Sequence, residues 1–235
     1  MIPTNASVDI SPRRAYAMTL MLIGSIIISF GGLAIRNIEM ADNWQINFYR
    51  SISFGLAILI VLLFRYGKRG HQKLTGIGLQ GVLAAVLLGG ASISFLLAIT
   101  NTTVAATTFT LSSIPFLTAI MAWLFLGERI GKSTVITMLI AGVGISLMFV
   151  QGLGSGTFYG NFMAFLCAIG FSSYAVIIRR NRRTEMLPTL ILSNLIIMLI
   201  ALIFTWDDLL ISWNDLLLCF VLGGLLSATV NTLFI

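Results

Sequence analysis

Residues 76–99 read GIGLQGVLAAVLLGGASISFLLAI, an apolar stretch that contains no charged side chain. An α-helix needs ~20 such residues to cross the ~30 Å hydrocarbon core of a membrane. Only helices and closed barrels satisfy every backbone group in lipid, and this stretch is too long and too apolar for a barrel strand. Seven similar stretches lie around it, at 15–38, 45–64, 103–126, 133–150, 159–178, 188–206 and 215–235. The sequence therefore predicts an all-α, polytopic membrane helical bundle with eight crossings.

The basic residues fall in alternate gaps between these stretches. The gaps after the first, third, fifth and seventh stretches contain no Lys or Arg, whereas the other gaps are basic. Cationic loops stay on the cytoplasmic side of a membrane. We therefore predict an inner-membrane protein with residues 1–14 as a cytoplasmic tail. The basic residues of the tail and gaps are Arg13, Arg14, Arg65, Lys68, Arg69, Lys73, Arg129, Lys132, Arg179, Arg180, Arg182 and Arg183.

The composition excludes several classes of function. Hydrophobic residues make up 58% of the chain and charged residues 9%, against about 25% charged in soluble proteins. The net charge is +6, and the basic residues that cause it lie next to span ends, where they meet lipid headgroups. We therefore expect no nucleic-acid partner. Cys167 and Cys219 lie inside apolar stretches and are interpreted as packing residues, and His71 as a solvated loop residue. We expect no cofactor and no metal site.

Two distant parts of the chain have related sequences and indicate an internal repeat. Residues 16–36 and 159–179 align without gaps, from Tyr to Arg, with Ser29 opposite Ser172. A second match relates VLLGG at 86–90 to VLGG at 221–224. Five spans separate the two copies, so the second copy crosses the membrane in the opposite sense. Inverted repeats of this kind are typical of secondary transporters, whose substrate site lies near mid-membrane between the repeats.

The repeat gives a domain organisation. Residues 15–150 form a first repeat of five helices, and residues 159–235 form a partial second repeat of three helices. By this plan about two helices of the second repeat are missing, which we interpret as a fragment or a truncated reading frame.

The fourth stretch carries the most specific motif. Residues 103–132 read TVAATTFTLSSIPFLTAIMAWLFLGERIGK, with Pro115 near the middle and Leu-Gly-Glu-Arg at 126–129. Residues 47–50, Asn-Phe-Tyr-Arg, open the second stretch. These features resemble the EamA-type members of the drug/metabolite transporter superfamily. The resemblance implies ten helices in two inverted repeats that move small metabolites through a central cavity.

The same stretch supplies three candidate substrate-binding residues. Thr108, Ser112 and Pro115 follow i, i+4, i+7 spacing and so share one face of a helix. Pro115 has no N–H, which frees the carbonyl of Leu111 and allows the helix to kink. Two interpretations remain open: these residues contact substrate, or they allow close packing while the hydroxyls bond their own backbone.

Three further polar residues lie inside predicted spans. Arg50 either reaches outward or pairs with Glu39 or Asp42, or else it gives the extracellular mouth a positive potential that favours anionic or zwitterionic substrates. Asn231 is costly in hydrocarbon unless it has a partner or faces a wet cavity, and Tyr174 is a weaker candidate of the same kind. Glu128, at the end of the fourth stretch, is interpreted as a cap or as an ion-pair partner of Arg129 or Lys132.

Together these features predict a secondary transporter that is not an enzyme. No Asp or Glu lies in the middle third of a stretch, which disfavours proton-coupled efflux of cationic drugs. We expect an exporter or permease of small, amino-acid-like, anionic or zwitterionic metabolites. Its partners are membrane lipids and the substrate, and a homo-oligomer remains open. The alternatives are a non-transporting scaffold subunit and a membrane-embedded lipid-modifying enzyme, although the stretches lack the clustered acid, base or metal ligands that an enzyme needs.

Overall fold

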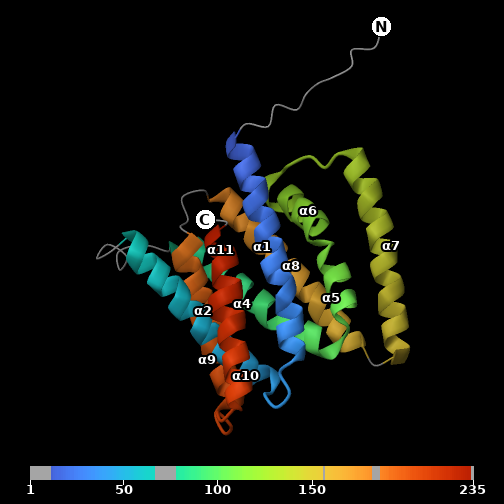
Figure 1. Cartoon of the computed structure of the whole chain (residues 1–235). Helices are drawn as coiled ribbons and strands as arrows, with labels where there is room; N and C mark the ends of the chain where they lie inside the picture. Colours follow the sequence, from blue (N-terminus) through green and yellow to red (C-terminus); the bar gives the residue numbers. More distant parts are fainter. Residues whose placement is uncertain (1–11, 67–77, 156, 182–185, 234–235) are drawn as a thin grey trace.

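The computed structural model describes residues 12–66, 78–155, 157–181 and 186–233, and the regular elements in these ranges are all helices. The predicted all-α bundle is therefore confirmed. In chain order the helices are α1 (Pro12–Arg36), α2 (Asn43–Tyr66), α4 (Gly78–Asn101), α5 (Val104–Leu111), α6 (Ile114–Leu126), α7 (Lys132–Ser155), α8 (Phe158–Arg180), α9 (Met186–Thr205), α10 (Trp213–Phe220), the π-helix η2 (Val221–Ser227) and α11 (Ala228–Leu233) (Figure 1).

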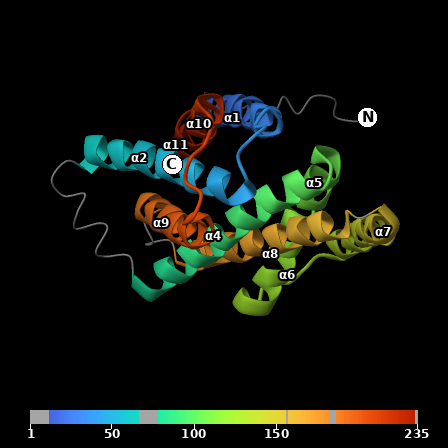
Figure 2. The same cartoon turned by 90° about the horizontal axis from the view of Figure 1, so that it is seen from below.

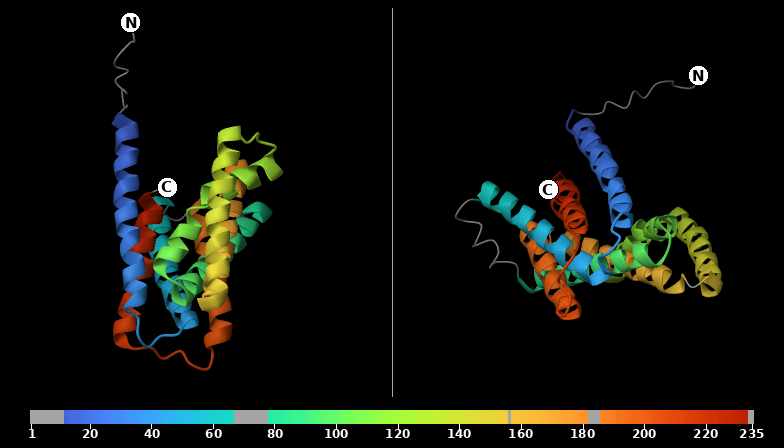
Figure 3. Two further views of the ribbon diagram at one scale, coloured as in Figure 1. Left: turned by 90° about the vertical axis from the view of Figure 1, so that its right-hand side faces the viewer. Right: turned by 60° about the horizontal axis from the view of Figure 1, so that its bottom comes forward.

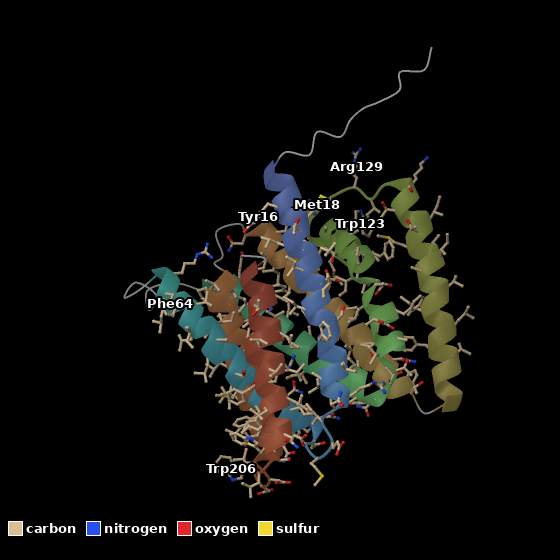
Figure 4. The ribbon with its side chains drawn as sticks, viewed as in Figure 1. Tyr16, Met18, Phe64, Trp123, Arg129 and Trp206 are labelled. Atoms are coloured by element: carbon tan, nitrogen blue, oxygen red, sulfur yellow. The ribbon has the colours of Figure 1, made fainter. Side chains whose placement is uncertain are left out.

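Seven segments of the described chain are long and apolar enough to cross a membrane. They coincide with the predicted stretches except the fifth, for which α7 contributes a shorter apolar segment, Lys132–Leu147. Large apolar side chains on the outside of the bundle, among them Met18, Phe64 and Trp123, suit contact with lipid (Figure 4). Phe64 is 89% exposed, a position that only an apolar surrounding makes favourable. The division into five and three spans stays a prediction.

Successive spans run in opposite directions, so the loops gather at two ends of the bundle (Figure 1). Arg129 lies at one end and Trp206 at the other (Figure 4). We name the first the basic end, with Arg65, Arg129, Lys132 and Arg179, and the second the acidic end, with Glu39, Asp42, Asp207, Asp208 and Asp215. Residues 1–11 of the predicted tail, His71, and the basic residues Lys68, Arg69, Lys73, Arg182 and Arg183 lie outside the described residues. Because α1 begins at Pro12, Arg13 and Arg14 belong to its first turn.

The centre of the bundle is the long contact between α4 and α8, with α2 and α9 packed beside it (Figures 2 and 3). Glycines allow the α4–α8 approach: a Cβ at Gly160 would lie 2.6 Å from the backbone of Asn101, and one at Gly170 would lie 2.9 Å from Ala91. Ala164 and Ala168, two further small residues of α8, are fully buried. These small residues therefore allow close helix packing.

The first glycine of each matched pair, Gly89 and Gly223, lies against a neighbouring helix. A Cβ at Gly89 would lie 3.2 Å from the Ser193 carbonyl and would also touch Ile197, both on α9. A Cβ at Gly223 would overlap the Arg50 carbonyl and touch the backbone N of Phe54, both on α2. The alignment that pairs Tyr16 with Tyr159 also pairs Arg50 with Ser193 and Phe54 with Ile197. Helix α4 thus packs on α9, and η2 packs on α2.

The fourth span is broken in two, close to the position that Pro115 predicts. Helix α5 ends at Leu111 and α6 begins at Ile114, so Pro115 lies in the first turn of α6, where a missing N–H costs nothing. The Ser172 hydroxyl of α8 donates to the carbonyl of Ile114 at 3.1 Å. Helix α6 ends at Gly127, whose φ of +69° is the left-handed conformation that glycine adopts without strain.

Candidate functional site

Arg50 lies on α2 between the two halves of the chain. Its guanidinium lies within electrostatic range of Cys167 on α8 and Cys219 on α10. One terminal nitrogen donates a long hydrogen bond, 3.5 Å, to Oδ1 of Asn47. The Nε atom is buried and has no hydrogen-bond partner in the described part of the chain. The guanidinium is thus held in the protein with part of its donor capacity unused.

Arg50 forms no ion pair with any described residue. The interpretation that it pairs with Glu39 or Asp42 is therefore wrong. Those two side chains are exposed at the acidic end. Asn47 is fully buried and donates to the Asn43 carbonyl at 3.2 Å, which leaves its Oδ1 directed at Arg50. Sequence reasoning missed Asn47, although its i, i+3 spacing from Arg50 was a usable signal.

Tyr174 borders the same interior region, deeper toward the basic end. It follows Cys167 by two helical turns on one face of α8. It packs against a cluster that includes Phe54 and Ile58 of α2 and Ala228 of α11. Asn231 lies one turn beyond Ala228 and donates to the Ser227 carbonyl at 2.8 Å. The structure therefore brings Arg50 and Tyr174 to one interior region, with Asn231 close to its margin.

The three candidates of the fourth span lie elsewhere. Thr108 and Ser112 are exposed, and their hydroxyls donate to the carbonyls of Val104 at 2.9 Å and Phe109 at 2.6 Å. Such bonds to the residue's own helix are what the packing interpretation predicts. The break after α5 interrupts the spacing that would place Pro115 on the same face. Contact of these residues with substrate stays a prediction.

A hollow of about 570 Å³ lies between α6, α7 and α8. Its lining is mostly apolar and includes Phe116, Phe149, Phe162 and Phe165. The hydroxyls of Ser113 and Ser146, also in the lining, donate to the carbonyls of Thr110 and Gly142. An anionic metabolite would therefore find no free hydroxyl donor on these two serines.

A smaller cavity of about 230 Å³ at the basic end is lined by Pro115 and by charged residues. Among them, Glu128 forms an ion pair with Arg179, with 3.0 Å between the charged atoms. The Glu128 side chain is 43% exposed and the Arg179 side chain is 59% exposed. The interpretation of Glu128 as an ion-pair partner is confirmed, but the partner is Arg179 on α8 and not the adjacent Arg129 or Lys132. The pair joins the end of the fourth span to the end of the sixth.

Three polar side chains at the acidic end connect distant parts of the chain, a role that sequence reasoning missed. The Asp215 carboxylate accepts backbone hydrogen bonds from Glu39, Met40 and Ala41. Gln45 donates to the Asp208 carbonyl at 2.9 Å, and the Tyr49 hydroxyl donates to the Leu209 carbonyl. In the described ranges, no three His, Cys, Asp or Glu side chains gather where they could hold a metal ion.

A bundle of helices that are long and apolar enough to cross a membrane defines a multi-pass membrane protein. The model of the EamA-like transporter family matches residues 15–150, which is more than half of the chain. The chain therefore belongs to the EamA-like transporter family, and the resemblance noted in the sequence is confirmed. Neither the curated proteins nor the solved structures contain a match to it.

Proposed function

We propose that this protein is a secondary transporter of the inner membrane, with its basic end in the cytoplasm. It carries small, amino-acid-like metabolites that are anionic or zwitterionic, as an exporter or permease. The observation that carries this proposal is the half-buried Arg50 inside an apolar span, whose Nε atom is buried and has no protein partner within the described ranges.

The energetics of a buried charge support an anionic group in the substrate. A cation inside a membrane protein is costly unless it is paired or hydrated, and such residues usually mark a substrate or ion pathway. A guanidinium offers planar, paired donors that match a carboxylate in two-point geometry. The neighbouring thiols of Cys167 and Cys219 are weak hydrogen-bond partners and leave that capacity free for a ligand.

The position of Arg50 supports alternating access. The Arg50 carbonyl lies against Gly223, where the last span crosses α2. In the related crossing, Gly89 of α4 lies against α9. In inverted-repeat transporters the substrate site lies between the repeats, which rock around it. Membership of a transporter family also favours transport over the alternatives of a scaffold subunit or a lipid-modifying enzyme.

The test is transport by cells that express the protein, with metabolites profiled inside and outside. Arg50→Ala should reduce transport of the identified metabolite about 10–100-fold, because a charge-assisted hydrogen-bond pair contributes ~1.5–3 kcal/mol. Arg50→Lys should keep part of the activity, since it keeps the charge but loses the planar donors. Arg129→Ala is the matched control, because Arg129 is an exposed cation at the basic end. Undiminished transport by Arg50→Ala would remove Arg50 from the site.

Ser112→Leu tests the fourth span separately. If the joint between α5 and α6 contacts substrate, a bulky apolar side chain there should abolish transport. If transport continues, Ser112 serves only the joint itself, through its bond to the Phe109 carbonyl.

A further inference from the structure

The loop between α1 and α2, residues 37–42, is tied to the last span by one carboxylate. Asp215 accepts hydrogen bonds from the backbone N–H groups of Glu39, Met40 and Ala41 at 3.4, 3.1 and 3.0 Å. The side chain of Asp215 is only 3% exposed, although it lies at the acidic end of the bundle. Three donors from one half of the chain thus converge on one acceptor from the other half.

A second set of bonds joins the start of α2 to the loop between α9 and α10, residues 206–212. Gln45, which is 5% exposed, donates to the carbonyls of Asp208 at 2.9 Å and Leu210 at 3.4 Å. Its Oε1 accepts from the backbone N–H of Asp42 at 2.7 Å. One helical turn further along α2, the Tyr49 hydroxyl donates to the Leu209 carbonyl. These bonds also cross from one half of the chain to the other.

Both sets lie between the acidic end and Arg50. Asp215 stands one helical turn before the fully buried Cys219, and Gly223, one turn further on, lies against the Arg50 carbonyl. On the facing helix, Tyr49 directly precedes Arg50. A solute that approaches Arg50 from the acidic end between α2 and α10 therefore has to pass these bonds.

We propose that Asp215, Gln45 and Tyr49 form a gate at the acidic end, closed in this structure, which must open before a solute can reach Arg50 from that end. The proposal rests on the proposed function, since a gate implies a path. Every donor and acceptor in the gate lies at an end of the bundle, where water can replace each bond as it breaks. The gate can therefore open without leaving buried polar groups unpaired.

The native thiol of Cys219 reports on this gate. The experiment uses the Cys167→Ala background, so that Cys219 is the single remaining cysteine, in protein purified into lipid nanodiscs. A small, charged methanethiosulfonate reagent is added and the labelling rate is measured by mass. With the gate intact, labelling should be slow, because the thiol is fully buried. Asp215→Asn should accelerate it at least tenfold, because the new amide group places N–H donors against the backbone donors of the loop.

Two further variants keep the test decisive. Tyr49→Phe removes one hydroxyl, too small a change to unfold the protein, and should accelerate labelling about threefold. Asp207→Asn removes the same charge from an exposed residue of the same end and should leave the rate unchanged. The proposal is overturned if Cys219 in Asp215→Asn and Tyr49→Phe is labelled at the original rate, or if Asp207→Asn accelerates labelling equally. Labelling needs no substrate, so its outcome is independent of whether Arg50 supports transport.

Discussion

The two ends of the bundle hold the same halves of the chain together by different means. At the acidic end, directional hydrogen bonds from Asp215, Gln45 and Tyr49 connect loops of one half to the other. Toward the basic end, α2 and α9 meet through the aliphatic side chains of Ile58, Leu62, Leu187 and Leu190. Hydrogen bonds at a bundle end can be exchanged for water, whereas aliphatic contacts have no such substitute. In this structure the acidic end is therefore held by bonds that water can replace, and the basic half by apolar packing that water cannot replace.

The comparison depends on the two ends facing opposite sides of a membrane, which single-cysteine labelling tests directly. In a background with Cys167→Ala and Cys219→Ala, Leu210→Cys places a thiol on a residue that is 90% exposed at the acidic end. An impermeant maleimide should label it in intact cells. Arg129→Cys, exposed at the basic end, should be labelled only after the cells are permeabilised. Labelling of both from the same side would refute the topology.

The tight crossing near Arg50 should be the most sensitive point of the packing. In Gly223→Ala, the new Cβ overlaps the Arg50 carbonyl, so we expect a loss of about 3 kcal/mol in the free energy of unfolding. Gly90→Ala is the matched control, because a Cβ there has no neighbour within 4 Å. It should be neutral or stabilising by about 0.5–1 kcal/mol, since Ala favours a helix over Gly. Thermal unfolding in nanodiscs measures both, and equal Tm values would contradict the crossing.

Much of this architecture could be predicted from the sequence. Hydropathy predicts the helices because lipid leaves the backbone no alternative, and Pro115 predicts a break because its ring removes an N–H. Arg50 could be singled out because a cation inside an apolar span is rare. The sequence also shows the match between the glycine pairs at 89–90 and 223–224, and Gly89 and Gly223 each lie against a neighbouring helix.

Other features could not be predicted because they depend on contacts between distant residues. Asp215 reads as an ordinary polar residue at the start of a span, and its three donors lie some 175 positions earlier in the chain. The π-helix Val221–Ser227 has no sequence signature of its own. It appears where Gly223 and Gly224 press against α2, and the Ser227 hydroxyl donates to the Leu222 carbonyl five residues back. That Arg50 has no ion-pair partner among the described residues likewise became visible only in three dimensions.

The acidic-end bonds should also contribute to stability. Asp215→Asn weakens three hydrogen bonds to a buried carboxylate, so we expect the free energy of unfolding to fall by about 1–3 kcal/mol. Asp207→Asn, an exposed position at the same end, should change the Tm by no more than about 1 °C, because surface substitutions have small effects. Thermal unfolding of the two variants in parallel measures the difference. If Asp215→Asn is as stable as Asp207→Asn, the acidic end is not held by this carboxylate.

The smallest effect belongs to the ion pair at the basic end. Glu128 and Arg179 are 3.0 Å apart but roughly half exposed, so water and salt screen their attraction. Glu128→Gln should therefore lower the free energy of unfolding by at most about 0.5 kcal/mol, and raising the salt concentration should remove even that difference. Unfolding at low and high salt, with the original protein alongside, measures it. A loss as large as that of Asp215→Asn would mean that both ends depend on polar contacts. The contrast between the hydrogen bonds of the acidic end and the apolar packing of the basic half would then have to be abandoned.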